Sequence, residues 1–359
     1  MAATSRTLSY DALLTTTADK IHKSGAVQDA ITSSNPTFAE FMTKGRIKKK
    51  VHGGDQIRVG LMYQHNGTIG PYSRYGQIDI TPQDGITTGY LPWAQYGGGV
   101  SIDGLSTFKN MGKERLTDLL KEKIVQTTAG WSEKLNRDLW DVDGRQATHP
   151  HSGESGTQIV CLPLYIQGLS ATTADDYDIM NIDQSVETWW KNKEGTPGAD
   201  TYFGLNAAMR KLYNDCSQGP GGFPDLIISD QVSYEIYETG MDAKTRYSFS
   251  DKASVGFEQV AFKQAKMFWD GYCPDAETAA SANGVLDTGS ALAEGSMYFI
   301  NTKTMCLYVG KDKDWKPRGF QTPVDQDAST SLYLAYLQLV CDNRRKNGVL
   351  YAIEPTIVS

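Results

Sequence analysis

The feature that most constrains this chain is a long amphipathic stretch in its first half, at residues 112–141. Its apolar residues recur at steps of mostly four: Leu116, Leu120, Ile124, Trp131, Leu135 and Leu139. This spacing places them on one face of an α-helix, while most of the Lys, Glu and Arg residues between them fall elsewhere. Such a helix would run roughly 45 Å at 1.5 Å per residue, well beyond the usual length. We therefore expect a strut that spans the molecule.

The segment before this helix has β character. Residues 55–64 alternate apolar side chains with polar or small ones, which is the two-residue period of a strand. Residues 65–85 carry turn signals in dense succession, and residues 86–102 form a second extended arm. The pattern predicts a long β-hairpin with an aromatic tip that bears Tyr72, Arg74 and Tyr75. Two strands alone are marginal in water, so we expect another copy of the chain to cover them.

The segment after the helix reads as mixed α/β, beyond a polar loop at residues 145–158. We expect an apolar strand at 159–169, a helix at 204–218 and a strand–helix pair at 224–240. Two hairpins are predicted near the end of the chain, at 296–312 and 330–355. The second is centred on an Asn-Gly step, which is a strong hairpin signal.

A basic run precedes the predicted hairpin and comprises Lys44, Arg46, Lys48, Lys49 and Lys50. Two interpretations stay open: a solvated linker, or an arm that lies on an acidic neighbour. Contact with nucleic acid fits less well, because no aromatic residues interleave the basic ones. The whole chain also has a net charge of −7, whereas a general nucleic-acid binder would present a basic face.

Signatures of catalysis are missing from the sequence. There is no glycine-rich dinucleotide or P-loop pattern, no GxSxG and no HExxH. His149 and His151, with Asp143 and Glu154 nearby, are the best candidates for metal ligands, but they lack a partner at fixed spacing. An acidic turn at 175–178 likewise lacks the spacing of a calcium loop. We expect no catalytic residue, no bound metal and no cofactor.

The five cysteines lie far apart and form no CxxC pair. This pattern indicates buried, reduced thiols, as expected of an intracellular product. No stretch approaches about 18 continuous apolar residues, and no long apolar run follows the first positive charges. We therefore expect neither a membrane span nor a signal peptide.

The order of these parts resembles the major capsid protein of tailed double-stranded DNA bacteriophages. Two stretches look particularly similar: WAQYGGGVSIDGLSTFKNMGKERLTDLL (93–120) and STSLYLAYLQLVCDNRRKNGVLYAIEP (329–355). The resemblance implies an α+β capsid fold with a long spine helix, an extended β-hairpin and a mixed α/β domain. Its parts would be an N-terminal arm (1–53), an E-loop (54–105), a P-domain spine helix with the following loop (106–154), an A-domain mainly within 155–330, and C-terminal strands that return to the P-domain (331–359).

The same resemblance implies a structural protein rather than an enzyme. Such a chain self-assembles through hexamers and pentamers into an icosahedral shell that encloses the packaged double-stranded DNA. It would be located in the virion after assembly in the host cytoplasm, and it would meet a portal protein and, optionally, a decoration protein. Packaged DNA would lie inside without sequence-specific binding, and no membrane would be involved. The helix begins near residue 112, which leaves too little chain for an N-terminal scaffolding domain, so we expect a separate scaffolding protein.

The resemblance also bears on how subunits would meet. Some members of the family cross-link neighbouring subunits through a lysine on the E-loop, but residues 66–86 contain no lysine. Contacts of the tip through Tyr72, Arg74 and Tyr75 are therefore expected to be non-covalent, and Lys48, Lys49 and Lys50 are further candidates for subunit contact.

Two alternatives stay open. An encapsulin-like shell would share the fold and differ in its contents, a cargo enzyme instead of DNA. A metal-dependent hydrolase built on the α/β segment 159–240 would use His149 and His151, and a metal assay on the purified monomer would test it.

Overall fold

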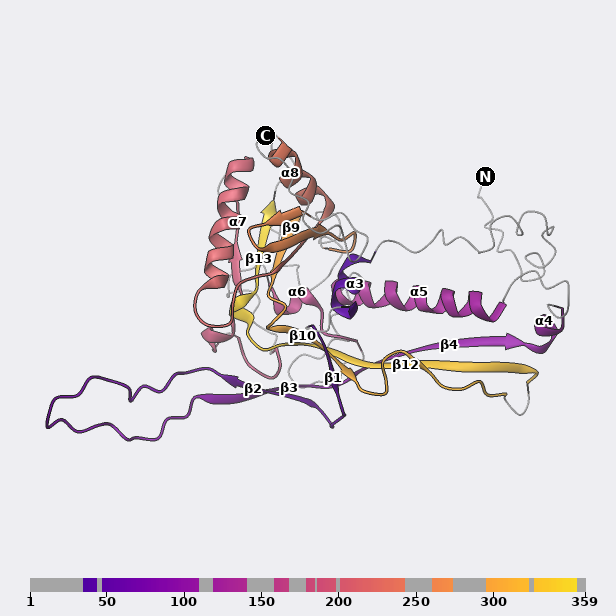
Figure 1. Ribbon diagram of the computed structural model, residues 1–359, viewed down its shortest axis with the longest axis horizontal. Helices are drawn as coiled ribbons and strands as arrows, with labels where there is room; N and C mark the ends of the chain where they lie inside the picture. The colour runs from indigo at the N-terminus through magenta and orange to yellow at the C-terminus, as the bar shows by residue number, and fades with distance from the viewer. Residues whose placement is uncertain are drawn as a thin grey trace. The chain divides into compact units, whose positions relative to one another are not determined.

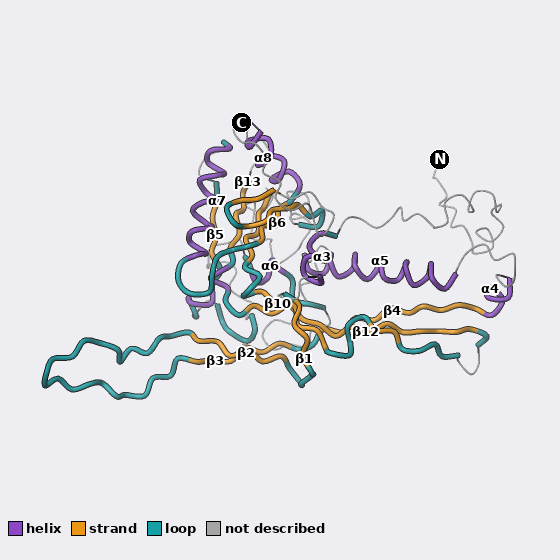
Figure 2. The backbone as a smooth tube through the Cα atoms, in the orientation of Figure 1, coloured by secondary structure: helices purple, strands orange, loops and turns teal. Residues whose placement is uncertain are grey.

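The computed structural model (Figures 1 and 2) describes residues 35–43, 47–109, 119–140, 158–167, 179–184, 186–197, 201–242, 260–273, 295–322 and 326–353. The chain forms two compact units. The first unit includes residues 97–134 and 315–335, and the second includes residues 34–96, 135–314 and 336–359. We describe each unit by itself.

Helix α5 (Leu119–Trp140) lies within the helix predicted for residues 112–141, and residues 110–118 lie outside the described part. Trp131, Leu135 and Leu139, which belong to the predicted apolar stripe, are buried. The pattern of apolar residues therefore predicted the buried face of the helix correctly over its described C-terminal half.

In the first unit, residues 119–134 of α5 lie along strands β4 (Ala94–Asp103) and β12 (Ala328–Cys341), as Figure 1 shows. Strand β11 (Lys316–Pro317) pairs antiparallel with β12. Trp131 stacks on Trp315, with ring centroids 4.4 Å apart and planes within 9°. Gly98 of β4 lies directly beside this pair, since a Cβ at that position would come 2.8 Å from the Trp315 ring. The close approach of backbone to indole explains why a glycine occupies this position. Helix α4 (Gly104–Lys109) follows β4, and its Gly104 N–H donates to the Asp327 carbonyl at 2.9 Å.

A six-stranded sheet dominates the second unit. Its strand order is β5 (Lys193–Gly195), β13 (Gly348–Ile353), β9 (Gly295–Ile300), β6 (Leu226–Ser229), β8 (Ala265–Trp269) and β7 (Val260–Phe262). Helices α7 (Tyr202–Ser217) and α8 (Gln231–Asp242) cover one face through a shared apolar core. On the other face, Trp140 packs edge-on against Tyr298 at 5.1 Å. Helix α7 and the β6–α8 pair confirm the helix predicted at 204–218 and the strand–helix pair predicted at 224–240.

Both predicted late hairpins are wrong in their pairing. Strand β9 does not pair with β10 (Met305–Gly310), and β12 does not pair with β13. Instead β9 pairs with β13 and β10 pairs with β12, both antiparallel. The two turns between the sheets lie side by side, because the Asn301 N–H donates to Asn347 Oδ1 at 2.8 Å and the Asp342 N–H donates to the Thr304 carbonyl at 2.8 Å. The antiparallel pair β9–β13 of one sheet thus continues, through these two turns, as the antiparallel pair β10–β12 of the other sheet.

The strand predicted at 159–169 is also wrong. This segment contains the short helix α6 (Leu162–Tyr165), and all four residues of the helix are buried. A short apolar run does not distinguish a buried helix from a buried strand. Pro163 favours the helix, because proline is tolerated in the first helical turn and cannot donate to a sheet.

The predicted early hairpin is present at its base. Strand β2 (Ile57–Met62) pairs antiparallel with β3 (Ile86–Leu91), and Ile57, Val59 and Leu61 are buried while the residues between them are exposed. Residues 63–85 continue beyond the paired strands without helix or strand (Figure 2). The second arm differs from the prediction, because its later part is β4, which pairs with β12 rather than with β2.

Candidate subunit-contact surfaces

Lys48, Lys49 and Lys50 form most of strand β1 (Lys48–Val51), which pairs parallel with β10. The strand is held in place at both ends. The Ile47 carbonyl accepts from the Leu307 N–H at 2.7 Å, and the Val51 carbonyl accepts from the Lys311 N–H at 2.8 Å. Within the described part of the chain, β1 is the edge of its sheet, with β10 as its one neighbour. Lys44 and Arg46, also in the basic run, lie outside the described residues.

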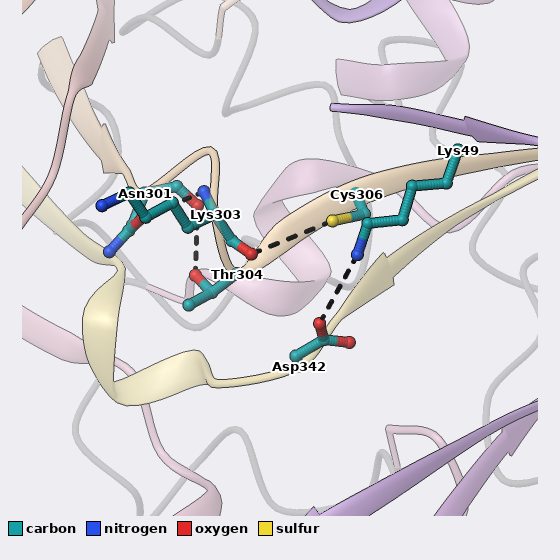
Figure 3. Close-up of polar contacts among 6 residues, drawn as sticks. All are labelled: Lys49, Asn301, Lys303, Thr304, Cys306 and Asp342. Carbon is teal, nitrogen blue, oxygen red and sulfur yellow. Dashed lines mark hydrogen bonds and ion pairs between the residues drawn. The ribbon is translucent and has the colours of Figure 1, made fainter. Parts of the chain in front are cut away.

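The three lysines of β1 differ in their surroundings. Lys48 Nζ forms an ion pair with Asp314 Oδ2 at 2.7 Å. Figure 3 draws the ion pair between Lys49 Nζ and Asp342 Oδ2, whose atoms lie 4.0 Å apart. Lys49 Nζ also lies 5.5 Å from the centre of the Tyr308 ring. Lys50 is exposed and has neither an ion pair nor a side-chain hydrogen bond with any described residue. Among the described residues, Lys50 is therefore the lysine of β1 without a charged neighbour.

The pair between Lys49 and Asp342 is weak. Burial raises the pKa of Asp342, and the attraction of Lys49 only partly opposes this rise. Burial lowers the pKa of Lys49, but the Cys306 thiol, Tyr308 and Asp342 together outweigh it and leave the pKa raised. The separation of 4.0 Å and the partial exposure of both side chains weaken the attraction.

Residues 63–85, which we call the tip segment, leave large apolar side chains in solvent. Tyr72 is 68% exposed and Tyr75 is 92% exposed, and Arg74 between them is exposed as well. Ile78 and Ile80 are 62% and 89% exposed. So many exposed apolar side chains in one segment are typical of an interaction surface.

The base of the tip segment and the adjoining strand β3 contact residues 180 and 189 of the same unit. Tyr63 stacks on Trp189, with centroids 5.8 Å apart. The Tyr90 N–H donates to the Met180 carbonyl at 3.3 Å. Gly89 leaves room for the Met180 side chain, since a Cβ at Gly89 would come 3.0 Å from it. The sequence showed the adjacent pair Trp189-Trp190, but nothing in the pattern linked it to Tyr63.

A buried carboxylate anchors helix α3 (Pro36–Thr43), and no pattern in the sequence pointed to it. Asp270 accepts from the Thr37 N–H at 3.3 Å, the Thr37 hydroxyl at 2.5 Å and Asn136 Nδ2 at 3.0 Å. Asn136 Oδ1 accepts from the Phe38 N–H at 2.9 Å. The N–H groups in the first turn of a helix have no acceptor within the helix. Here the side chains of Asp270, which follows β8, and Asn136 of α5 accept their hydrogen bonds.

A buried arginine organises the connections around α6. Arg344 was predicted to lie in a hairpin loop, but it is fully buried. Its guanidinium donates to the carbonyls of Tyr165 and Trp190, both at 2.8 Å, and to Gln184 Oε1 at 2.9 Å and Asn192 Oδ1 at 3.3 Å. Burial lowers the pKa of Arg344 to about 10, so it remains charged at neutral pH.

The described residues offer few side chains that could bind a metal ion or take part in redox chemistry. All five cysteines are free and buried, as predicted. The described residues contain no group of three His, Cys, Asp or Glu side chains that could hold a metal ion. His149, His151 and the acidic turn at 175–178 lie outside the described residues. None of the described helices is long and apolar enough to cross a membrane.

Comparison with known proteins identifies the fold. No family model matches the chain, and no curated protein matches it. Among solved structures, the chain is similar to the cyanophage A-1(L) capsid, with a TM-score of 0.57 and 15% identity over 91% of this chain and 95% of that one. It is also similar to the capsid of the native GTA particle, with a TM-score of 0.54 and 8% identity over 90% and 92% of the two chains. The cyanophage P-SCSP1u capsid matches with a TM-score of 0.50 and 11% identity over 92% of each chain. The chain therefore has the α+β fold of phage capsid proteins.

Proposed function

We propose that this chain is the major capsid protein of a tailed bacteriophage, which self-assembles into an icosahedral shell that encloses double-stranded DNA. The observation that carries the proposal is the tip segment, whose apolar and aromatic side chains have no cover from the described part of their own chain. Heterologous contacts repeated around closed rings would cover this segment in every copy at once. The fold shared with phage capsid proteins supports the same conclusion.

The parts of the chain map onto the capsid fold as follows in this proposal. The N-terminal arm is 1–53, the E-loop is 54–105, the P-domain helix with its loop is 106–154, the A-domain falls mainly within 155–330, and the C-terminal strands are 331–359. The hairpin of β2 and β3 and the exposed tip segment support the E-loop assignment. The mixed sheet covered by α7 and α8 supports the A-domain assignment.

Neighbouring copies would meet at the tip segment and at β1. Tyr72, Arg74 and Tyr75 offer aromatic area and one positive charge, a combination enriched in protein interfaces. Lys48 already has Asp314 within its own chain, so Lys50 is the clearer contact residue of β1. Replacing all three lysines with Glu should slow or block assembly, but it also breaks the Lys48–Asp314 pair, so Lys50 alone gives the cleaner test.

The partners in this proposal are other copies of the chain in hexamers and pentamers, a separate scaffolding protein during assembly, a portal protein and, optionally, a decoration protein. The net charge of −7 would limit adhesion of packaged DNA to the shell wall. The chain would reside in the virion after assembly in the host cytoplasm.

The contents of native particles test this function. Particles would be purified from a lysed host culture, treated with nuclease and separated on a density gradient, and their protein would be identified by mass spectrometry. We expect this chain to be the most abundant protein in particles that protect double-stranded DNA. Particles that hold a cargo protein and no DNA would establish the encapsulin-like alternative. A monomer with metal-dependent hydrolytic activity, absent from all particles, would establish the enzyme alternative.

A further inference from the structure

Among the described residues, one edge of strand β1 has no strand partner and presents backbone hydrogen-bonding groups. The carbonyls of Ile47 and Val51 accept hydrogen bonds from β10 and the residue that follows it. Backbone groups of successive residues in a strand point alternately to its two sides, so Lys48 and Lys50 direct their N–H and C=O groups away from β10. No described strand pairs with this side. The edge can therefore accept one more strand.

The chain also contains an extended segment that has no strand partner among the described residues. Residues 77–81 read Gln-Ile-Asp-Ile-Thr and alternate β-branched with polar side chains at their centre. Ile78 and Ile80 are largely exposed, and the structure shows no ladder for this segment. Asp79 Oδ1 accepts from the N–H and the hydroxyl of Thr81, which lowers the pKa of Asp79 and keeps it ionised. The segment thus has the side-chain alternation of a strand, no strand partner among the described residues and a negative charge at its centre.

The two features are complementary in charge and in pattern. Lys48 and Lys50 share one face of β1, whereas Lys49 lies on the other face beside the half-buried ring of Tyr308. If Asp79 faces Lys50, then Ile78 and Ile80 fall on the face of Tyr308 and the Lys49 stem. Lysines on a sheet edge disfavour strands that are neutral or basic, so the edge selects an acidic strand.

We infer that residues 77–81 of one copy add as a strand to the free edge of β1 in a neighbouring copy, with Asp79 opposite Lys50. This inference rests on the proposed function, because the partner is a second copy in the shell. Main-chain hydrogen bonds provide the attachment, and the Asp79–Lys50 pair and the two isoleucines select the partner and its register.

A charge exchange in the full-length chain tests the pair. Asp79→Lys and Lys50→Asp each place like charges opposite one another, and each is expected to weaken the contact by about fivefold or more. The double variant restores opposite charges and should assemble at close to the wild-type rate, measured by light scattering and by the assembled fraction on size exclusion. Glu235→Lys and Lys211→Asp are matched controls, since both residues are exposed and lie on α8 and α7, outside the tip segment and β1. They should assemble normally, and Glu235→Lys should not rescue Lys50→Asp.

A pair of cysteine substitutions tests the geometry independently of the charges. All five native thiols are buried. The variant that carries both Lys50→Cys and Asp79→Cys therefore adds two exposed thiols, which an oxidant can join. Oxidised particles should give a ladder of covalent oligomers on a non-reducing gel, and Lys50→Cys with Asp84→Cys should not.

Two failures can be told apart. If the wild-type chain forms shells but neither single charge variant slows assembly, or if the variant that carries both Lys50→Cys and Asp79→Cys gives no ladder, the strand addition is wrong and the shell function stands. If the wild-type chain forms no particles with its scaffolding protein, the proposed function itself is wrong.

Discussion

The buried carboxylate of Asp270 offers the sharpest local test of how this fold is held together. Asp270→Ala removes the acceptor for the Thr37 N–H, the Thr37 hydroxyl, the Asn136 amide and the Tyr272 N–H. Thr37 and Asn136 are themselves buried, so water does not readily replace the lost acceptor. We expect helix α3 to open locally while the rest of the second unit stays folded.

The size of the effect follows from the hydrogen bonds. A hydrogen bond to a charged group contributes about 1.5–3 kcal/mol, and two of these bonds belong to Thr37 in α3. Their loss should lower the free energy of opening α3 by about 3–6 kcal/mol. Each 1.4 kcal/mol is about tenfold in an equilibrium constant, so amides in α3 should exchange about 10² to 10⁴ times faster.

Hydrogen exchange followed by mass spectrometry measures this opening in a peptide that covers residues 35–43. Asp225→Ala is the matched control, because Asp225 accepts from the Thr302 N–H at 2.8 Å and from its hydroxyl at 2.5 Å in a different turn. That variant should speed exchange around residues 301–304 and leave α3 unchanged. Unchanged exchange of α3 in a folded Asp270→Ala protein would refute the reasoning.

Three further predictions concern the cores and the thiols. Arg344→Met leaves two buried carbonyls without their donor and should lower the free energy of unfolding by about 3–5 kcal/mol. The melting temperature should fall, and an unchanged melting temperature would show that the hydrogen bonds of Arg344 are dispensable. Gly98→Ala forces a Cβ against Trp315 and should lower the free energy of unfolding by about 1–3 kcal/mol. Gly99→Ala should be close to neutral, because the nearest atom to its Cβ would lie 3.8 Å away. Equal effects of the two substitutions would contradict this account. Burial raises the pKa of the Cys216 and Cys341 thiols to about 12, so about one in 10⁴ is ionised at pH 8, and a thiol reagent should label them only after unfolding.

The sequence predicted the elements better than their pairing. Periodic patterns found α7, the β6–α8 pair and the buried face of α5, because each of these depends on contacts within one segment. The Asn347-Gly348 step indicated a hairpin, yet the turn connects two sheets instead. The side chain of Asn347 accepts from Asn301, a residue 46 positions earlier, and no local pattern reports such a contact.

The candidate contact surfaces were found only in part. Exposed aromatic residues of the tip segment could be expected from its turn-rich composition, since nothing nearby could bury Tyr72 or Tyr75. The sequence could not predict that Lys48 is paired and Lys50 is not, because this difference depends on Asp314, which is 266 residues from Lys48. Asp270 and Arg344 were missed for the same reason, since a charged residue in a polar stretch looks solvated until its distant partners are known.

Assembly of the purified chain tests the central claim most directly. The full-length protein would be expressed alone and together with its scaffolding protein, then analysed by size-exclusion chromatography and negative-stain electron microscopy. The account predicts closed shells, or rings of five and six copies, in at least one of the two preparations. A chain that stays monomeric in both preparations, with a tip segment that protease cleaves readily, would contradict the account.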